Sequence, residues 1–474
     1  MIHYIFLCIL LIFNPLSICF SDFRLSEKVA PGVVYFQEYY SQGPWHIHVL
    51  EINLWNSGIT LESAIAKNSL FGREKTSVIA SQQSQIDHYV VGAINADFFE
   101  GNGNPIGGQI IKGQLINEPI SRSVFGMTTT GRPFITILNW SGQLVFADKV
   151  LCQLQGFNQR RNSDGWFLYN SFFTDDTLSL KTGILLEASL DSKIFSVNES
   201  MNFKIQHVRE ANPVIVNSDR INERIVRLIG PKSEINGFKT GDSFQILIKM
   251  EPIQDKIDLL VGGLPRLIRE GEVSIEWKKE NIRESFAIEK HPRTAVGFTK
   301  DQQKVLFFVV DGRQPGYSVG MTLQELAEYM RQWEIYQGVN LDGGGSSTMV
   351  VHGNVVNQPS DLSGEREVAN ALMVVNNLDR TDSKRLNINP DEISLQPGSK
   401  ILFQVNFHEM NYLPLPGSPE SVRWYCPKNL GSVDTRGLFQ ADSLLTSGYL
   451  YVQTDTMIDS AKIIITDSLM IRSN

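Results

Sequence analysis

Three consecutive glycines, at residues 343–345, interrupt an otherwise β-prone segment and limit the folds open to this chain. An apolar run before them delivers Asn340 and Asp342, and two serines and a threonine follow before the next β-prone run. Glycine in a regular element costs roughly 0.5–1 kcal/mol relative to alanine. Three in a row therefore indicate a backbone that needs positive φ, or one that another group approaches closely. For an isolated triple glycine, a tight turn between strands is the simplest interpretation.

A second part of the chain has the same layout. Residues 94–97 and residues 339–342 both read apolar residue, Asn, small or apolar residue, Asp. Each is followed by a glycine-rich loop and a hairpin-like run that ends in Asn-x-Pro, and residues 262–271 form a weaker third copy of the hairpin. We hypothesise that the two units face one another and bring Asp97 and Asp342 to one cleft. The alternative is that such hairpins recur in any β-rich protein.

Composition and charge narrow the class of protein. The chain has 474 residues, which is too long for one typical domain. Its hydrophobic content of 42% and charged content of 20% are those of a globular protein. The formal net charge is −8 and no run of Lys or Arg stands out, which argues against a nucleic-acid partner. A chain with this charge must bind an anion with local groups rather than with its overall field.

The N-terminus is typical of a signal peptide. An apolar run at residues 5–18 precedes small residues, which predicts a signal over residues 1–21 and cleavage after Ser21. The run is shorter than the ~20 residues that a membrane helix needs, so we expect a secreted, periplasmic or cell-surface protein without a membrane span after cleavage. Two of the four cysteines lie in this segment. The remaining pair, Cys152 and Cys426, forms neither a disulfide framework nor a zinc pattern.

Two regions follow the predicted signal. Alternating and continuous apolar runs with few helices predict an α+β catalytic domain with mixed β-sheets over residues 22–378. Its best-marked helix begins after Thr322, which with Glu325 can form a capping box. A polar linker at residues 376–384 then leads to short strands that recur every 8–12 residues. That spacing predicts an all-β immunoglobulin-like sandwich over residues 385–474.

Three aspartates, Asp97, Asp311 and Asp342, are expected at the ends of apolar strands. Carboxylates held in a partly desolvated cleft can act as general acid, general base or nucleophile. The structural alternative is that an aspartate before glycine forms a turn. Clustered aspartates also leave open a structural divalent cation such as calcium, but the alternating ligands of an EF-hand are missing. We therefore predict no cofactor.

Other groups near these aspartates suit an anion. Guanidinium groups pair bidentately with phosphate or carboxylate, and successive glycine amides can form an anion nest. A serine or an arginine in such a place is also a common structural element, as a turn residue or an ion-pair partner. The candidate substrate-binding residues are Asn95, Arg293, Arg313, Asn340, Gly343, Gly344, Gly345, Ser346, Ser347 and Arg366.

Several sharper motifs are absent from the sequence. No lysine stands beside the glycines, as a Walker A loop requires, and no Gly-x-Gly-x-x-Gly spacing marks a dinucleotide site. Thr348 occupies the position where a nucleophile elbow around Ser346 needs its second glycine. The remaining pattern of carboxylates, arginines and a glycine loop suits a substrate with a labile bond beside a negative charge.

The ordered motifs resemble the phosphodiester glycosidase domain family over about residues 85–375. They are Asn95 with Phe98-Phe99, Gly103-x-Pro105-x-Gly107, Arg293-Thr294-Ala295-Val296-Gly297, Asp311-Gly312-Arg313, Met321-Thr322-Leu323-x-Glu325-Leu326-Ala327, Asn340-Leu341-Asp342-Gly343-Gly344-Gly345-Ser346-Ser347-Thr348 and Val368-Ala369-Asn370-Ala371-Leu372. The resemblance implies an α-N-acetylglucosaminidase-like hydrolase. It would cleave a sugar-1-phosphodiester, on a phosphorylated glycan or a small diester, into free sugar and a phosphomonoester.

Glycosidases usually place two carboxylates on either side of the bond, and the resemblance implies Asp342 in one of these roles, with Arg293, Arg313 and the glycine amides on the phosphate. Asp97 rests on the repeat alone, because lysosomal members of the family have Asn-Gly-Gly-Phe-Phe where this chain has Asn-Ala-Asp-Phe-Phe at residues 95–99. The alternative function is a non-catalytic protein that binds cell-envelope glycans.

Overall fold

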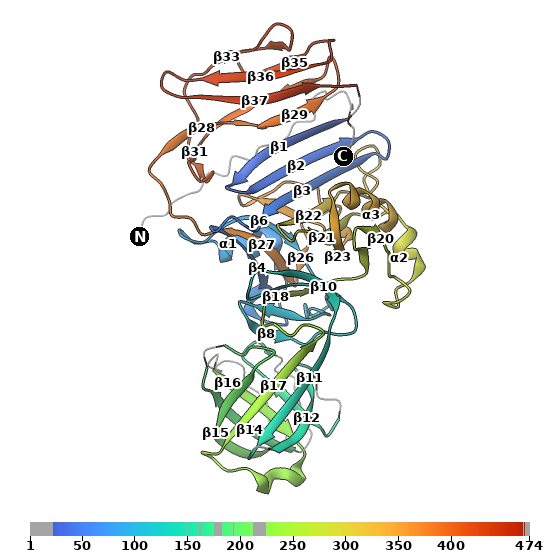
Figure 1. Ribbon diagram of the computed structural model, residues 1–474, viewed down its shortest axis with the longest axis vertical. Coiled ribbons are helices and arrows are strands. Elements are labelled where there is room, and N and C mark those ends of the chain that lie inside the picture. The colour runs from blue at the N-terminus through green and yellow to red at the C-terminus, as the bar shows by residue number, and fades with distance from the viewer. Residues whose placement is uncertain are drawn as a thin grey trace.

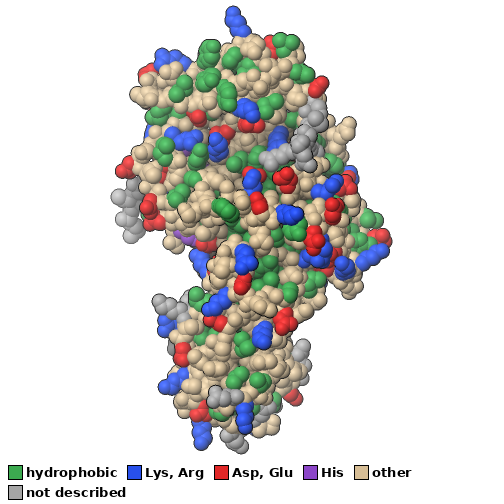
Figure 2. Space-filling model, in the orientation of Figure 1, with side chains coloured by type: hydrophobic (Ala, Val, Ile, Leu, Met, Phe, Trp, Pro, Cys, Tyr) green, Lys and Arg blue, Asp and Glu red, His purple; other side chains and the backbone are tan. Residues whose placement is uncertain are grey.

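The computed structural model describes residues 22–147, 149–160, 163–174, 183–192, 194–211, 224–467 and 469. The predicted signal peptide lies outside these ranges. No helix within them is both long and apolar enough to cross a membrane. The molecule is elongated, and a β-barrel projects from a larger body of sheets (Figure 1). Figure 2 shows the waist between the two parts and, on this face, acidic and basic side chains interspersed over both.

The described chain is β-rich almost throughout, so the predicted α+β class is wrong. Its α-helices are short: α1 (Thr76–Gln83), α2 (Glu284–Ile288) and α3 (Leu323–Gln332). The capping box predicted for α3 is confirmed, because Thr322 Oγ1 accepts from the Glu325 amide and the Glu325 side chain accepts from the Thr322 amide. Most connections between strands are hairpins and loops rather than helices. For this reason the helices predicted from the sequence were a poor guide to the fold class.

One 12-stranded sheet runs through the larger body, and α3 packs on it through a core that contains Leu326, Met330 and Phe308. Its strands in spatial order are β20 (Glu272–Val273), β19 (Arg266–Arg269), β23 (Ile335–Asn340), β21 (Arg293–Thr299), β22 (Lys304–Val310), β3 (Trp45–Asn53), β2 (Val33–Tyr40), β1 (Phe23–Ala30), β29 (Glu392–Leu395), β37 (Ile458–Ile465), β36 (Thr446–Gln453) and β33 (Arg423–Tyr425). The apolar run at residues 305–310 is buried, as expected for a central strand.

The C-terminal strands do not form the distinct immunoglobulin-like domain that their spacing predicted. Strand β29 pairs with β1, with Phe23 opposite Leu395, so the C-terminal strands continue the N-terminal sheet. Leu25 of β1 also packs against the C-terminal core. An open sheet edge is a liability, and β29 covers the free edge of β1. The other strands here are β28 (Lys384–Asn389), β30 (Lys400–Leu402), β31 (Gln404–Glu409), β32 (Pro414–Leu415), β34 (Gly431–Val433) and β35 (Leu438–Ala441).

The projecting part is a closed barrel with an aromatic core that includes Phe157, Trp166, Phe203 and Phe244. In barrel order its strands are β11 (Asn139–Phe146), β12 (Lys149–Phe157), β13 (Trp166–Tyr169), β16 (Ile225–Gly230), β14 (Gly183–Leu190), β15 (Ser200–Ala211) and β17 (Ser243–Glu251). Closure removes sheet edges altogether. The β-rich pattern of this region was evident in the sequence, but its closure was not.

Three strand–loop–hairpin units occupy the centre of the molecule. Strand β6 (Tyr89–Asn95) leads to the hairpin β7 (Gln109–Ile111) and β8 (Gln114–Asn117); β18 (Ile257–Gly262) leads to β19 and β20; β23 leads to β24 (Met349–Val351) and β25 (Asn354–Val355). Each hairpin pairs with the strand of another unit, because β7 pairs with β18, β19 with β23, and β24 with β6. The three units thus form a closed ring of exchanged hairpins.

The three hairpin turns are alike. Lys112 and Gly113 have φ values of 47° and 78°, His352 and Gly353 have 47° and 77°, and Glu270 and Gly271 have 55° and 84°. Two successive positive φ values are those of a type I′ turn. The repeated layout, including the weaker third copy, is therefore confirmed. The ring brings the loops after β6, β18 and β23 together.

The remaining strands complete the smaller sheets around this ring. They are β4 (Ile59–Ile65) and β27 (Asn370–Asn376), which extend the sheet of β6, β9 (Ser123–Thr128) and β10 (Pro133–Ile137), which extend the sheet of β18, and the short pair β5 (Glu74–Lys75) and β26 (Glu367–Val368). Short 3₁₀ turns are η1 (Ala66–Asn68), η3 (Lys232–Gly237) and η4 (Gly344–Ser346).

Candidate active site

The loops after β6 and β23 are joined to each other by backbone and side-chain hydrogen bonds. The Asp342 amide donates to Ala96 O over 2.9 Å, and Asn95 Nδ2 donates to Asp342 O over 2.6 Å. The buried Asn95 also accepts from the Thr294 hydroxyl at 2.9 Å and from the Thr348 amide at 3.1 Å. Asn95, predicted to bind substrate, is thus surrounded by protein groups that fix the Asp342 loop.

Asp97 and Asp342 are neighbouring carboxyl groups with raised pKa values. The pKa of Asp97 is raised from 3.8 to about 7, mainly by burial and also by the charge of Asp342. The amide of Gly107, which donates to Asp97 Oδ2 over 2.7 Å, acts in the opposite direction. Burial likewise raises the pKa of Asp342 to about 6, against the Ser346 hydroxyl and the Arg366 charge. Near neutral pH one carboxyl can therefore keep its proton while the other is ionised.

Glycines make room for the Asp97 carboxylate. A Cβ atom on Gly262 would lie 2.4 Å from Asp97 Oδ2, and one on Gly107 would lie 2.8 Å from the same oxygen. A Cβ on Gly263 would lie 2.8 Å from Asn340 O. All these distances are too short for any other residue, so the loop after β18 has to be glycine where it meets the other two loops. In the sequence these glycines were recognised only as the start of the weaker third copy of the hairpin, and no role was predicted for them.

The triple glycine is explained by what approaches it. A Cβ on Gly343 would lie 2.8 Å from Pro292 O, and one on Gly345 would lie 2.2 Å from Arg366 Nη2. Gly344 has φ +64° and faces the Arg313 guanidinium. The Gly344 amide donates to Pro292 O at 2.9 Å, so this amide is not free for an anion. The predicted nest of three amides therefore loses its middle member.

Of the three candidate arginines, Arg313 is the one open to an anion. It is exposed, and within the described ranges no carboxylate pairs with it. Its Nη2 lies 3.3 Å from His291 Nδ1. Arg366, by contrast, holds Asp361 bidentately, with Nε and Nη2 at 2.7 and 2.9 Å from the carboxylate oxygens. That pair lies against Gly345, so it borders the site with its charge already compensated.

Arg293 is buried and engaged with the backbone. Its Nε donates to Met321 O at 2.8 Å, and its Nη2 donates to Phe286 O and Glu289 O at 2.9 and 2.8 Å. The pKa of Arg293 is lowered to about 10, mainly by burial and also by the charge of Arg313. These bonds hold the C-terminal end of α2 and the start of α3 together, which is a positioning role rather than the phosphate contact that was predicted for it.

Asp311 is placed at the end of β22, as predicted, but its carboxylate is held by protein donors. Asn357 Nδ2 lies 2.9 Å from Oδ1, and the Gln358 amide and the Tyr317 hydroxyl also donate to the carboxylate. His48 Nε2 lies 3.4 Å from Oδ2. These contacts are all outside the Asp97–Asp342 pair, and a catalytic role for Asp311 stays a prediction.

Several buried polar atoms beside Asp342 lack partners. The hydroxyls of Ser347 and Thr348 and the Oδ1 atom of Asn340 are buried without a hydrogen-bond partner among the described residues. Asn340 Nδ2 donates to Leu264 O and Leu341 O, each at 2.7 Å. Buried polar groups nearly always have partners, so this cluster is suited to a ligand or to ordered water.

Sequence reasoning missed some residues of the site. His291 contacts Arg313, Asp361 pairs with Arg366, and the charge of Arg122 lowers the pKa of Asp97. Gly107 lay within a quoted motif but had no role. His291 could have been noted because it directly precedes Pro292 and Arg293, but nothing in the sequence places Arg122 near Asp97.

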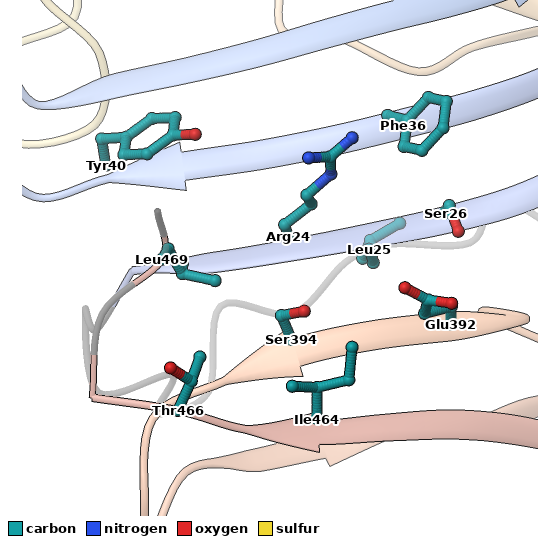
Figure 3. A pocket seen from close by; sticks show the side chains of 10 residues that line it. All are labelled: Arg24, Leu25, Ser26, Phe36, Tyr40, Glu392, Ser394, Ile464, Thr466 and Leu469. Atoms are coloured by element: carbon teal, nitrogen blue, oxygen red, sulfur yellow. The ribbon is translucent and has the colours of Figure 1, made fainter. Parts of the chain in front are cut away.

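The cavity shown in Figure 3 lies elsewhere. It has a volume of about 470 Å³ and is formed by β1 and β2 against β29 and β37. Arg24 points into it, but Arg24 is paired with Glu38 at 3.2 Å and lies 4.9 Å from the ring of Phe36. None of the predicted site residues lines this cavity.

Part of the chain matches a known protein family. A model of the phosphodiester glycosidase family matches residues 187–375, a span that holds Asp311, Arg313 and Asp342 but not Asp97. This span belongs to the phosphodiester glycosidase family. The matched residues include β18 and β23, which are the first strands of two of the three central units. Strand β6, the first strand of the remaining unit, precedes the matched residues. The family match therefore does not cover the loop that carries Asp97.

The chain is 34% identical over 121 residues to the N-acetylglucosamine-1-phosphodiester alpha-N-acetylglucosaminidase of Mus musculus, which is 24% of this chain and 23% of that protein. It thus spans about a quarter of the length of this relative. Two solved structures have similar folds: a hypothetical protein from Synechocystis, with TM-score 0.57 and 18% identity over 73% of this chain and 62% of that chain, and a protein from Burkholderia pseudomallei, with TM-score 0.51 and 23% identity over 70% and 74%.

Proposed function

We propose that the protein is a phosphodiester glycosidase that hydrolyses a sugar-1-phosphodiester. The products are the free sugar and a phosphomonoester. The observation that carries the proposal is the pair of neighbouring carboxyls, with pKa values raised mainly by burial to about 7 at Asp97 and about 6 at Asp342. Beside them lies the exposed Arg313, which has no carboxylate partner in the described part of the chain.

The two carboxyls divide the proton chemistry between them. Asp97 has the higher pKa and so holds the proton near neutral pH, which it gives to the phosphate oxygen as the bond to the anomeric carbon breaks. Asp342, with the lower pKa, is the ionised partner on the other side of the reacting carbon. Water supplies the hydroxyl of the released sugar, and its second proton restores the acid.

Arg313 supplies the positive charge for the phosphodiester. Its guanidinium lies against Gly344, directly after the loop that presents Asp342. A fork of N–H donors matches two phosphate oxygens. The unpartnered Ser347 and Thr348 hydroxyls and Asn340 Oδ1 would then bind the sugar or the phosphate oxygens. The names of the related enzymes make N-acetylglucosamine the first sugar to test, in a substrate of the cell envelope or the extracellular space.

The test is release of free sugar from a panel of sugar-1-phosphodiesters by the wild-type protein and by Asp342→Asn. Asp455→Asn is the matched control, because this carboxylate is exposed and lies in the turn between β36 and β37. We expect the Asp342 variant to lose at least 100-fold in kcat and the control to keep wild-type turnover. Absence of turnover of every diester by the wild-type protein, or equal turnover by Asp342→Asn, would falsify the proposal. Glycan binding without turnover would then favour the non-catalytic alternative.

A further inference from the structure

A second, smaller cavity lies at the waist of the molecule, where the loop after Asp97 meets the barrel. Its volume is about 290 Å³, and its lining includes Phe71, Asn104, Glu118 and Gln159. In Figure 1, β8 and β18 lie just above the barrel at this level. The cavity therefore lies between the loop that follows Asp97 and the barrel.

Hydrogen-bonding groups in this wall are left open toward the cavity. Asn104 Oδ1 is buried and has no hydrogen-bond partner among the described residues. One oxygen of Glu118 accepts from the Phe157 amide at 2.7 Å, which leaves the other to a ligand. Gln159 Nε2 donates to Asn117 Oδ1 at 2.9 Å, so its carbonyl oxygen remains. Three acceptors of this kind match the donors of a polyhydroxylated ligand.

An aromatic wall completes the cavity. Phe71 is half-buried and meets Phe173 edge to face, with ring centroids 5.3 Å apart. A ring held in this way offers a flat apolar surface, which suits the C–H face of a pyranose. The lining carries Arg160 together with Glu100 and Glu118, and burial raises the pKa of Glu118 to about 7, so the wall offers no excess of positive charge to a phosphate group.

We propose that this cavity binds a neutral saccharide unit of the substrate, away from the bond that is cleaved. The loop between Asp97 and β7 connects the two places. Asn117 Nδ2 donates to the carbonyls of Pro105 and Gly107, each at 2.9 Å, and the Gly107 amide donates to Asp97. Gln159 in turn donates to Asn117. One chain of hydrogen bonds thus runs from the cavity wall to Asp97.

The saccharide assignment extends the proposed function, but its first test does not need turnover. The probes are neutral trisaccharides of N-acetylglucosamine, mannose and glucose, titrated by calorimetry into wild type, Phe71→Ala and Glu118→Gln. The matched controls are Tyr425→Ala and Glu210→Gln, which are exposed residues of the C-terminal strands and the barrel. We expect at least one trisaccharide to bind, and its Kd to rise at least tenfold in both cavity variants. Lack of binding by all three probes, or an unchanged Kd in both variants, overturns the assignment.

A kinetic comparison tests whether the bound saccharide is part of the substrate. The two substrates are a sugar-1-phosphodiester of methanol and one whose alcohol is a disaccharide. Phe71→Ala should raise KM for the extended diester at least tenfold and leave kcat/KM for the methyl diester within twofold of wild type. Equal losses on both substrates would show a structural effect and overturn the link. If the wild type cleaves neither diester, the proposed function fails, while the calorimetry still decides whether the cavity binds saccharide.

Discussion

The proposed activity depends on a buried aspartate, Asp97, and a half-buried one, Asp342, which together should make it sensitive to pH. The reaction needs Asp97 protonated and Asp342 ionised, and their pKa values are about 7 and about 6. We therefore expect a bell-shaped dependence of kcat/KM on pH, with a maximum between about 6 and 7. Initial rates from pH 4 to 9 measure it. A profile that stays flat through this range would contradict the division of roles between the two carboxyls.

The same residues also affect stability. Both pKa values are higher in the folded protein than the ordinary 3.8 of aspartate, so the folded state binds more protons than the unfolded state between about pH 4 and 7. The contribution of these groups is therefore most favourable below pH 4 and is lost as the pH rises through 6 and 7. Asp97→Asn should raise Tm over wild type at pH 8 and lose this advantage near pH 4. Thermal melts at the two pH values test it, and an advantage that is larger at pH 4 would refute it.

Two arginines that look alike in sequence should behave in opposite ways. Arg313→Ala removes an exposed charge that no carboxylate of the described residues pairs with, so we expect a 10- to 100-fold loss of kcat/KM with an unchanged Tm. Arg293→Ala leaves the carbonyls of Phe286, Glu289 and Met321 without their donor and should lower Tm by several degrees. Arg436→Ala, an exposed arginine of the C-terminal strands, is the control for both. A lower Tm for Arg313→Ala would show that its role is structural.

At the scale of elements, the loop after β18 is the tightest point of the ring. Gly262→Ala would place a methyl group 2.4 Å from Asp97 Oδ2, so the loop or the carboxylate has to move. We expect at least a 100-fold loss of kcat, because small displacements of a catalytic group are costly. Gly237→Ala is the matched control, since a Cβ there meets no atom within 4 Å. Wild-type rates in Gly262→Ala would show that Asp97 takes no part in the reaction.

The elements also show what a sequence can and cannot predict. The capping box of α3, the buried β22 and the three X-Gly turns depend on residues within a few positions of each other, and all were predictable. The pairing of Phe23 with Leu395 depends on residues that are far apart in the sequence, so no local sequence pattern predicts it. In the site, the sequence placed Asp97 and Asp342 together through the repeat, yet it could not tell the exposed Arg313 from the buried Arg293.

At the scale of the whole molecule, the sheet that spans β1 and β29 joins the two ends of the chain. Deletion of residues 385–474 would expose the edge of β1 and the side chain of Leu25. We therefore expect the shortened protein to have a lower Tm and to self-associate, which melting and size-exclusion chromatography would detect. A monomer with wild-type Tm would instead mean that the C-terminal strands are an independent domain.

The exchange of hairpins also governs when the protein can become active during its synthesis. Strand β6 pairs with β24 on one side and with β27 on the other, and both of these strands come after Asp342 in the sequence. A chain still on the ribosome, with the Asp97 loop already synthesised, therefore cannot close the ring until β24 (Met349–Val351) has also emerged. Asp97 and Asp342 would meet in a single late step, so incomplete chains should carry no partial activity.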